Sequence, residues 1–241
     1  MKKRTFLKTS ALALGGTILS PYLGCSPRKP EDDLTPETLK NWAENFEFST
    51  QSVYYPSTVE EVQTLVKELD SLRVLGSRHS FNRIADSADH LISFDQMNRI
   101  IGLDREKMQV TVEGGIKYGT LSKYLHEQGF ALHNLASLPH ISVAGTIATA
   151  THGSGVENGN LSTSVAGIEF INAQGELISW IKEDPNFPAG VVGLGAFGPV
   201  TQVTLDIVPT FEVAQVVYLD LPFESLKENF TEIMSAGYSV S

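Results

Sequence analysis

Segments typical of strands and segments typical of helices follow one another in an irregular order along this chain. The steady strand–helix–strand rhythm of a doubly wound parallel sheet is absent, so the order predicts an α+β fold. With 241 residues, of which 41% are hydrophobic, the chain is long and apolar enough to bury a core. Apolar periodicity predicts strands at residues 73–75, 91–94, 109–113, 165–171, 177–181 and 200–208, and helices at residues 58–69, 121–128 and 143–150.

Local signals mark the ends of several of these elements. Ser57 with Glu60 three residues later resembles a capping box, so Ser57 is the expected cap of the first helix. The turn sequence at residues 173–176, Ala-Gln-Gly-Glu, predicts a hairpin between its flanking strands. Gly129 and Ser142 are the expected end of the second helix and start of the third.

The pattern restarts after Phe211, with a strand expected at residues 213–219 and a helix at residues 224–236. One strand and one helix cannot bury both their apolar faces alone. We therefore expect residues 211–241 either to dock on the preceding domain or to begin a second domain of a longer protein.

The N-terminus has the layout of an export signal. Basic residues at positions 2–4 precede an apolar stretch at 11–19 and a small-residue context that ends at Cys25. Residues 3–8, Lys-Arg-Thr-Phe-Leu-Lys, resemble a twin-arginine signal with lysine as the first basic residue, and Gly24-Cys25 resembles a lipobox. We expect export to the periplasmic side of a bacterial membrane, with a lipid anchor at Cys25 and a tether at 26–40.

Charge and cysteine content exclude several classes of protein. The net charge of −10 disfavours non-specific binding to nucleic acid, because the phosphate backbone is also negative. A single cysteine excludes both an intrachain disulfide framework and a thiolate metal site within one chain. No apolar run reaches the length of a bilayer-spanning helix.

Three candidate motifs are weak. Residues 193–198 read Gly-x-Gly-x-x-Gly, but Pro199 and a β-branched strand follow where a dinucleotide fingerprint needs a helix, so a glycine-rich turn is the better interpretation. Gly153-Ser154-Gly155 lacks the outer glycines of a nucleophile elbow. Of the six histidines, no pair has the i, i+4 spacing of a zinc protease, so we expect no metal site.

Two segments rich in small residues suit an anionic phosphate. Residues 76–80, Gly-Ser-Arg-His-Ser, follow a strand and combine backbone N–H groups, hydroxyls and a guanidinium. Residues 137–146 lead into a helix whose first turn is almost wholly small, which would let a phosphate approach its free N–H groups. Taken separately, each segment is equally consistent with an ordinary loop or a tightly packed helix.

Together these segments resemble the FAD-binding domain of the vanillyl-alcohol oxidase/p-cresol methylhydroxylase type, and within it the alditol (xylitol) oxidases of the aldonolactone oxidase group. The resemblance begins at Asn41-Trp42-Ala43 and includes Val74 to Asn82, Asn134 to Gly145 and Thr151 to Gly155. It ends at Ala236 to Ser241, and the block from Asn134 to Gly145 is its most specific part. It implies a two-subdomain FAD-binding domain at 41–210 and the start of an incomplete substrate domain at 211–241.

The resemblance also implies roles for particular residues. His79 corresponds to the histidine that bonds covalently to the 8α-methyl of the flavin, and Arg78 stands where other members carry glycine. A neutral imidazole held against that methyl is a competent nucleophile. Ser137 is the one plausible substrate-side contact, whereas no catalytic base can be assigned. The implied cofactor contacts are Gly76, Ser77, Arg78, His79, Ser80, Ser137, Ser142, Gly145, His152 and Val200.

The chemistry implied by the resemblance is oxidation of a polyol C–OH by hydride transfer to flavin N5, with dioxygen as acceptor and hydrogen peroxide as product. An aldonolactone oxidase or dehydrogenase is the nearest alternative, because the same cofactor domain serves both and the choice lies in the substrate domain. A lipid-anchored FAD-binding module without turnover is the alternative from another class.

Overall fold

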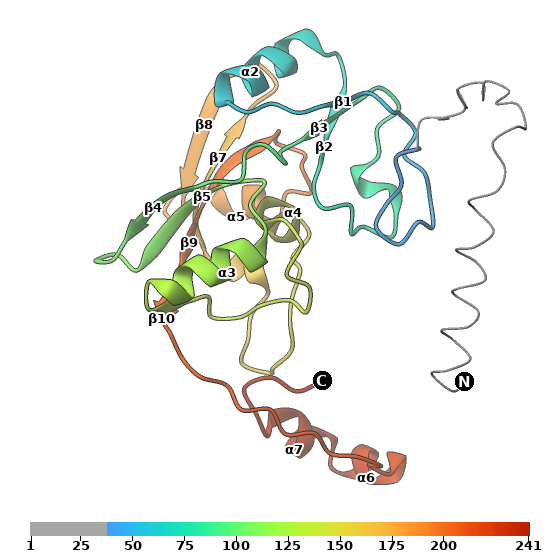
Figure 1. The fold of residues 1–241 in the computed structure, drawn as a ribbon, viewed down its shortest axis with the longest axis vertical. Helices are drawn as coiled ribbons and strands as arrows, with labels where there is room; N and C mark the ends of the chain where they lie inside the picture. The colour runs from blue at the N-terminus through green and yellow to red at the C-terminus, as the bar shows by residue number, and fades with distance from the viewer. Residues whose placement is uncertain (1–37) are drawn as a thin grey trace, which may run out of the picture. The chain divides into compact units, whose positions relative to one another are not determined.

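The computed structural model describes residues 38–241, and the expected leader and most of the tether lie outside this range. Figure 1 shows the order of the elements. The strands are β1 (Val53–Tyr54), β2 (Leu72–Leu75), β3 (His90–Ser93), β4 (Ile100–Asp104), β5 (Gln109–Glu113), β6 (Phe130–Ala131), β7 (Val165–Ile171), β8 (Leu177–Ile181), β9 (Val200–Asp206) and β10 (Val208–Pro209). The α-helices are α2 (Val59–Glu68), α3 (Tyr118–Glu127), α4 (Val143–Ala148), α5 (Phe187–Val191), α6 (Phe223–Glu228) and α7 (Phe230–Ser235).

The strands form two main sheets and one short ladder. Strands β1, β3 and β2 make a parallel sheet, and strands β4, β5, β9, β7 and β8 make an antiparallel sheet in that order. Strands β10 and β6 pair separately. The expected mixture of helix and sheet is therefore confirmed, and two main sheets are present.

The larger sheet is apolar on one face. Val110 and Val112 of β5 lie opposite Leu205 and Val203 of β9, and all four belong to a core cluster that also takes side chains from α3, α4 and α5. The other face carries polar pairs such as the hydroxyls of Thr111 and Thr204, 3.0 Å apart. Alternation along the strands thus directs these three helices to one face.

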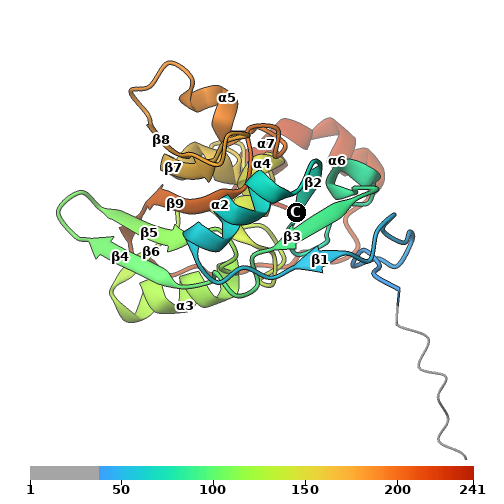
Figure 2. The same ribbon diagram turned by 90° about the horizontal axis from the view of Figure 1, so that it is seen from above.

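The smaller sheet is packed on both faces. Ile92 of β3 joins Val62 of α2 in one cluster, while Leu91 and Leu75 join Phe48 in another. Ile171, at the end of β7, belongs to the cluster around α2. It therefore connects the packing of α2 to the antiparallel sheet, and Figure 2 shows both sheets from above.

Local patterns predicted strands β5, β7 and β8 with their observed bounds, and the hairpin between β7 and β8 is confirmed. Helix α2 begins one residue later than expected, because Thr58 and not Ser57 is its N-cap. The Thr58 hydroxyl accepts from the Glu61 amide at 3.2 Å, and the Glu61 carboxylate accepts from Ser57. Helix α4 ends at Ala148, and the strand expected at 200–208 is divided into β9 and β10.

The C-terminal expectations were wrong in part. Residues 213–219 form no strand, and the helix expected at 224–236 is divided into α6 and α7 at Asn229. Neither α6 nor α7 contains a buried residue, and Figure 1 shows both projecting beyond the rest of the described chain. A β-branched segment needs a partner strand, and in residues 38–241 this segment has none. Among these residues, no helix has the length and apolar character needed to cross a bilayer.

Candidate functional site

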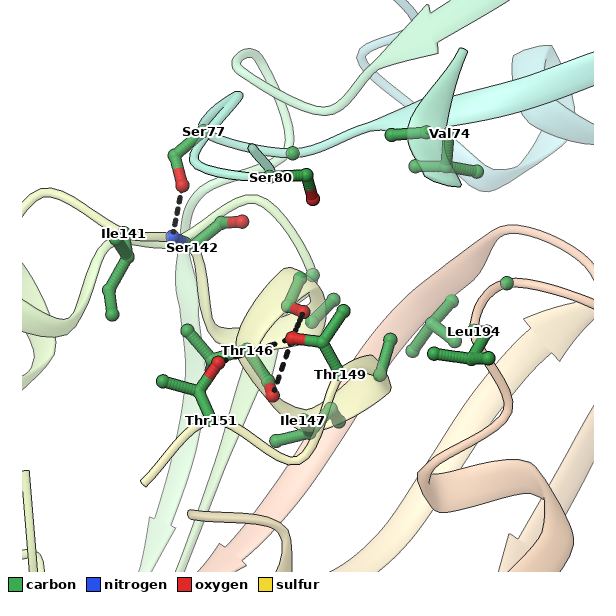
Figure 3. A pocket seen from close by; sticks show the side chains of 18 of the residues that line it. Val74, Ser77, Ser80, Ile141, Ser142, Thr146, Ile147, Thr149, Thr151 and Leu194 are labelled. Carbon is green, nitrogen blue, oxygen red and sulfur yellow. Dashed lines mark hydrogen bonds between the residues drawn. The ribbon is translucent and has the colours of Figure 1, made fainter. Parts of the chain in front are cut away.

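A cavity of about 620 Å³ lies where the two sheets and α4 meet. Its wall is formed by the loop after β2, helix α4, the two glycines that follow β5 and the turn between α5 and β9. Figure 3 shows Ser77 and Ser80 on one side and Thr146, Thr149 and Leu194 on the others. Segments that are far apart in sequence therefore share one concave site.

The two segments rich in small residues are in direct contact. The Ser142 amide donates to the Ser77 hydroxyl at 3.3 Å (Figure 3). A Cβ on Gly76 would lie 3.0 Å from Ser142 Oγ, and a Cβ on Gly145 would lie 2.7 Å from the same atom. The close approach therefore leaves little room for a side chain at either glycine, and the result is a narrow cradle lined by backbone.

The Ser142 hydroxyl has no hydrogen-bond partner within the described part of the chain, although the residue is only 4% exposed. It belongs to the N-cap residue of α4, yet it makes no capping bond. A buried hydroxyl without a partner costs free energy. A ligand oxygen between the two segments would supply the missing partner, so the cradle fits the pyrophosphate of FAD.

Positive charge gathers along the cavity of this acidic protein. Arg73, Arg78 and Lys117 line it, together with Asp95 as an anionic group. Lys117 donates to Asp95 at 2.8 Å. Burial raises the pKa of Asp95, but the hydrogen bond and charge of Lys117 outweigh burial and hold that pKa below its ordinary value. The local excess of cations favours a dianionic ligand.

Arg78 has a left-handed backbone, with φ of 62°. This conformation is unfavourable for a residue with a Cβ and explains why glycine suits the position. Two hydrogen bonds hold the loop in place: Trp42 N donates to the Arg78 carbonyl at 2.8 Å, and Arg78 Nη1 donates to the Lys40 carbonyl at 3.1 Å. Arg78 thus adds a cation to the cavity at the cost of backbone strain.

His79 lines the same cavity and is half-buried. Its Nε2 lies 2.5 Å from Nε2 of His140, and its ring stacks on Trp42 with centroids 4.5 Å apart. Burial and the nearby His140 both lower the pKa of His79, so its imidazole is neutral at neutral pH. His79 therefore has the protonation state that a nucleophile needs.

Nine of the ten expected cofactor contacts are in the wall of the cavity. The exception is His152, which is exposed and directs Nδ1 to the carbonyl of its own neighbour Gly153 at 2.8 Å. The assignment of each contact to FAD stays a prediction. The nine residues are Gly76, Ser77, Arg78, His79, Ser80, Ser137, Ser142, Gly145 and Val200.

The turn at residues 193–198 also lines the cavity, which the sequence did not predict. Strand β9 follows it, as expected for a motif that is not a dinucleotide fingerprint. Gly198 has φ of 128°, and a Cβ there would lie 1.8 Å from the Ile171 carbonyl oxygen, so this turn is built around glycine. In the sequence, the large apolar residues Leu194 and Phe197 between these glycines were the signal that could have indicated a binding surface, and both are exposed in the structure.

The described residues contain no group of three or more histidine, cysteine, aspartate or glutamate side chains arranged to hold a metal ion. The cavity instead combines a backbone cradle, cations and an apolar end near Phe170 and Leu194. This combination suits a long cofactor that has both a charged centre and flat apolar rings.

Comparison with known proteins agrees with this geometry. Residues 50–180 match the FAD binding domain family. The chain belongs to this family. Alditol oxidase from Streptomyces sp. (strain IKD472 / FERM P-14339) is 41% identical over 206 residues, which cover 84% of this chain and 49% of that protein.

Other relatives share the same part of the chain. L-gulonolactone oxidase from Mus musculus is 34% identical over 73% of this chain and 42% of that protein. D-arabinono-1,4-lactone oxidase from Kluyveromyces lactis (strain ATCC 8585 / CBS 2359 / DSM 70799 / NBRC 1267 / NRRL Y-1140 / WM37) is 30% identical over 83% of this chain and 40% of that protein. This FAD-binding chain therefore belongs to the alditol and aldonolactone oxidase group, and its matches span half or less of each relative.

Proposed function

We propose that this chain is the cofactor-binding part of an FAD-dependent oxidase that converts a polyol C–OH to the carbonyl and passes the electrons to dioxygen, giving hydrogen peroxide. The observation that carries the proposal is the cavity in which the two small-residue segments meet. The 41% identity to an alditol oxidase supports the substrate class.

Different residues of the cavity bind different parts of the cofactor. The Gly76–Ser80 loop and the start of α4 hold the pyrophosphate, with the Ser142 hydroxyl as a donor and Arg78 as a cation. Val200 and the turn at 193–198 hold the adenine end. His79 holds the flavin end, and Ser137, exposed in the same wall, contacts the substrate.

Bound FAD supplies the hydride acceptor, and the residues described here bind and orient it. The narrow cradle fixes the cofactor against the backbone, and the apolar end near Phe170 and Leu194 covers its adenine ring. The group that removes the substrate proton is not among the residues assigned here.

An aldonolactone oxidase is the second candidate, because relatives with that activity in their names match much of the same chain. Purified full-length protein, supplied with oxygen, should therefore be compared on a series of alditols and a series of aldonolactones. We expect a yellow flavin spectrum and a higher kcat/KM for peroxide production from alditols. Preference for lactones would support the second candidate, and flavin without peroxide from either series would support a binding module.

The proposal includes a covalent bond between His79 and FAD, supported by the position of this neutral histidine in the cavity wall. Flavin fluorescence should persist on the wild-type protein after acid denaturation and be lost from His79→Ala. His126→Ala is the matched control, since that histidine lies outside the cavity wall. Covalent flavin on His79→Ala would contradict the assignment.

We also propose export by the twin-arginine route, followed by anchoring through Cys25; both features lie in residues 1–37. FAD is a cytoplasmic product that stabilises only a folded protein, so loading before export is advantageous. A Lys3/Arg4 double replacement should keep the protein in the cytoplasm, and Cys25→Ala should release it from membranes. Envelope localisation of the first variant, or membrane binding of the second, would contradict the respective step.

A further inference from the structure

His140 contacts His79 but is not itself part of the cavity wall. The two Nε2 atoms are 2.5 Å apart, and the ring centroids are 4.6 Å apart with the planes inclined by 42°. The two nitrogens are close enough to share a hydrogen bond, in which one Nε2 carries a proton and the other offers a lone pair. Trp42 stacks on both imidazoles, at 4.5 Å from His79 and 6.1 Å from His140.

Each histidine is fixed by hydrogen bonds to the carbonyls on both sides of it. On either side of His79, the Arg78 and Ser80 carbonyls accept from Trp42 N and Asn41 Nδ2, at 2.8 and 3.0 Å. On either side of His140, the Pro139 and Ile141 carbonyls accept from the amides of residues 119 and 118, at 2.7 and 3.1 Å. The pair is therefore held by two separate parts of the fold, which is the arrangement of a preorganised site.

Only one direction of this hydrogen bond leaves His79 reactive. If His140 donated, His79 Nε2 would be occupied and its Nδ1 would carry the proton, so neither nitrogen could attack a carbon. If His79 donates from Nε2, its Nδ1 keeps a lone pair. Among the described residues, no hydrogen bond engages this Nδ1. Donation from His79 to His140 is therefore the state that permits coupling.

We propose that His140 is the positioning residue for covalent attachment of FAD: it orients His79 and accepts the Nε2 proton as the bond to the flavin forms. The proposal rests on the proposed bond at His79. His79 Nδ1 forms a C–N bond to the flavin methyl carbon, one C–H bond of that methyl breaks, and its proton leaves. The Nε2 proton moves to His140 Nε2, and dioxygen takes the two electrons from the ring, with two protons, as hydrogen peroxide.

The test starts from full-length protein purified without flavin from riboflavin-deprived cells, to which FAD and oxygen are added. Covalent flavin is then followed by the fluorescence of denatured samples. Loss of a general base costs about 10²- to 10⁴-fold, so His140→Ala should slow coupling by that factor. His140→Gln, which can accept a hydrogen bond but not a proton, should also be slow. Added imidazole should accelerate coupling in His140→Ala.

Three measurements separate this role from a structural one. Non-covalent FAD affinity and melting temperature should be unchanged within error in both variants, and His126→Ala should couple like the wild type. In flavin-free wild-type protein, ¹⁵N NMR should show the Nε2–H tautomer of His79. Wild-type coupling rates in His140→Gln, a lack of acceleration by imidazole in His140→Ala, or an Nδ1–H tautomer would each overturn the proposal. Wild-type protein that binds FAD without ever coupling it would overturn it through its premise at His79, a result distinguishable from the others.

Discussion

Ser142 is the residue through which the stability of the folded protein and its affinity for the cofactor are most directly connected. It is buried without a partner among the described residues, so the folded protein bears a cost that a bound phosphate oxygen would remove. In a His79→Ala background, where binding is reversible, Ser142→Ala should leave apoprotein stability unchanged or raised. FAD affinity should fall about 10- to 100-fold, the effect of losing a hydrogen bond to a charged group of about 1.5–3 kcal/mol.

Ser162→Ala is the matched control for this prediction. Ser162 is similarly buried, but its hydroxyl donates to the Ile147 carbonyl at 2.9 Å and it does not line the cavity. This variant should lose about 1 kcal/mol of stability and keep its FAD affinity. Chemical denaturation and fluorescence titration measure both quantities, and equal FAD affinity in the two variants would refute the role of Ser142.

The left-handed backbone of Arg78 gives a second prediction at this scale. Arg78→Ala and Arg78→Gly both remove the guanidinium and its bond to the Lys40 carbonyl, but only glycine relieves the strain at φ of 62°. We expect the glycine variant to be more stable than the alanine variant by about 1 kcal/mol. Urea denaturation of the two proteins measures this difference. A more stable alanine variant would show that the backbone at position 78 is not strained.

The lowered pKa values of two histidines should make the stability of the protein depend on pH. Burial lowers the pKa of His133, and burial together with His140 lowers that of His79. The unfolded chain therefore binds more protons, so the free energy of unfolding should decrease as the pH falls below about 6.5, the ordinary histidine value. A His79→Gln/His133→Gln double variant should have a flatter profile between pH 7 and 5. The same slope in wild type and variant would contradict this origin.

At the scale of elements, two neighbouring hydroxyl residues have different roles at the start of α2. Thr58 caps the helix, whereas Ser57 binds only the Glu61 side chain, which is exposed. Thr58→Ala should therefore cost about 1 kcal/mol of stability, and Ser57→Ala should cost less. Thermal denaturation measures the stability of the two variants. A larger loss of stability in Ser57→Ala would show that Ser57 is the N-cap, as the sequence predicted.

Elements with strong local patterns were predictable, and elements that depend on distant partners were not. Two apolar segments and the turn between them specify the hairpin of β7 and β8 without further information, although only β8 alternates between exposed and half-buried residues. Residues 213–219 have the same β-branched character, but a strand exists only where another strand accepts its hydrogen bonds. Short α5 was missed because five residues carry too little periodicity to be recognised.

The candidate site was predictable to a similar degree. Small residues marked both halves of the cradle, but their contact through Ser77 and Ser142 is a property of the tertiary fold. The same holds for the pairing of His79 with His140, which are 61 positions apart. The turn at 193–198 was correctly separated from dinucleotide fingerprints, yet its place in the cavity wall depends on how β9 joins the sheet.

At the scale of the whole molecule, the cavity is a junction between the two sheets. The loop after β2 extends from the parallel sheet, and the turn before β9 extends from the antiparallel sheet. Between them, Ile171 of β7 packs with the cluster around α2. A cofactor that contacts both walls would therefore stabilise the connection between the sheets as well as each loop.

This arrangement predicts how FAD changes stability. Free FAD at 100 times its Kd should stabilise the folded His79→Ala protein by about 2.7 kcal/mol, because it binds only the folded state. Hydrogen exchange should slow in the loop after β2 and also in the turn before β9, since both line the cavity. Residues 213–219 should show no change, because they lie outside the cavity wall and their apolar side chains are exposed. Protection confined to one wall would mean that FAD binds to one half of the cavity and does not connect the sheets.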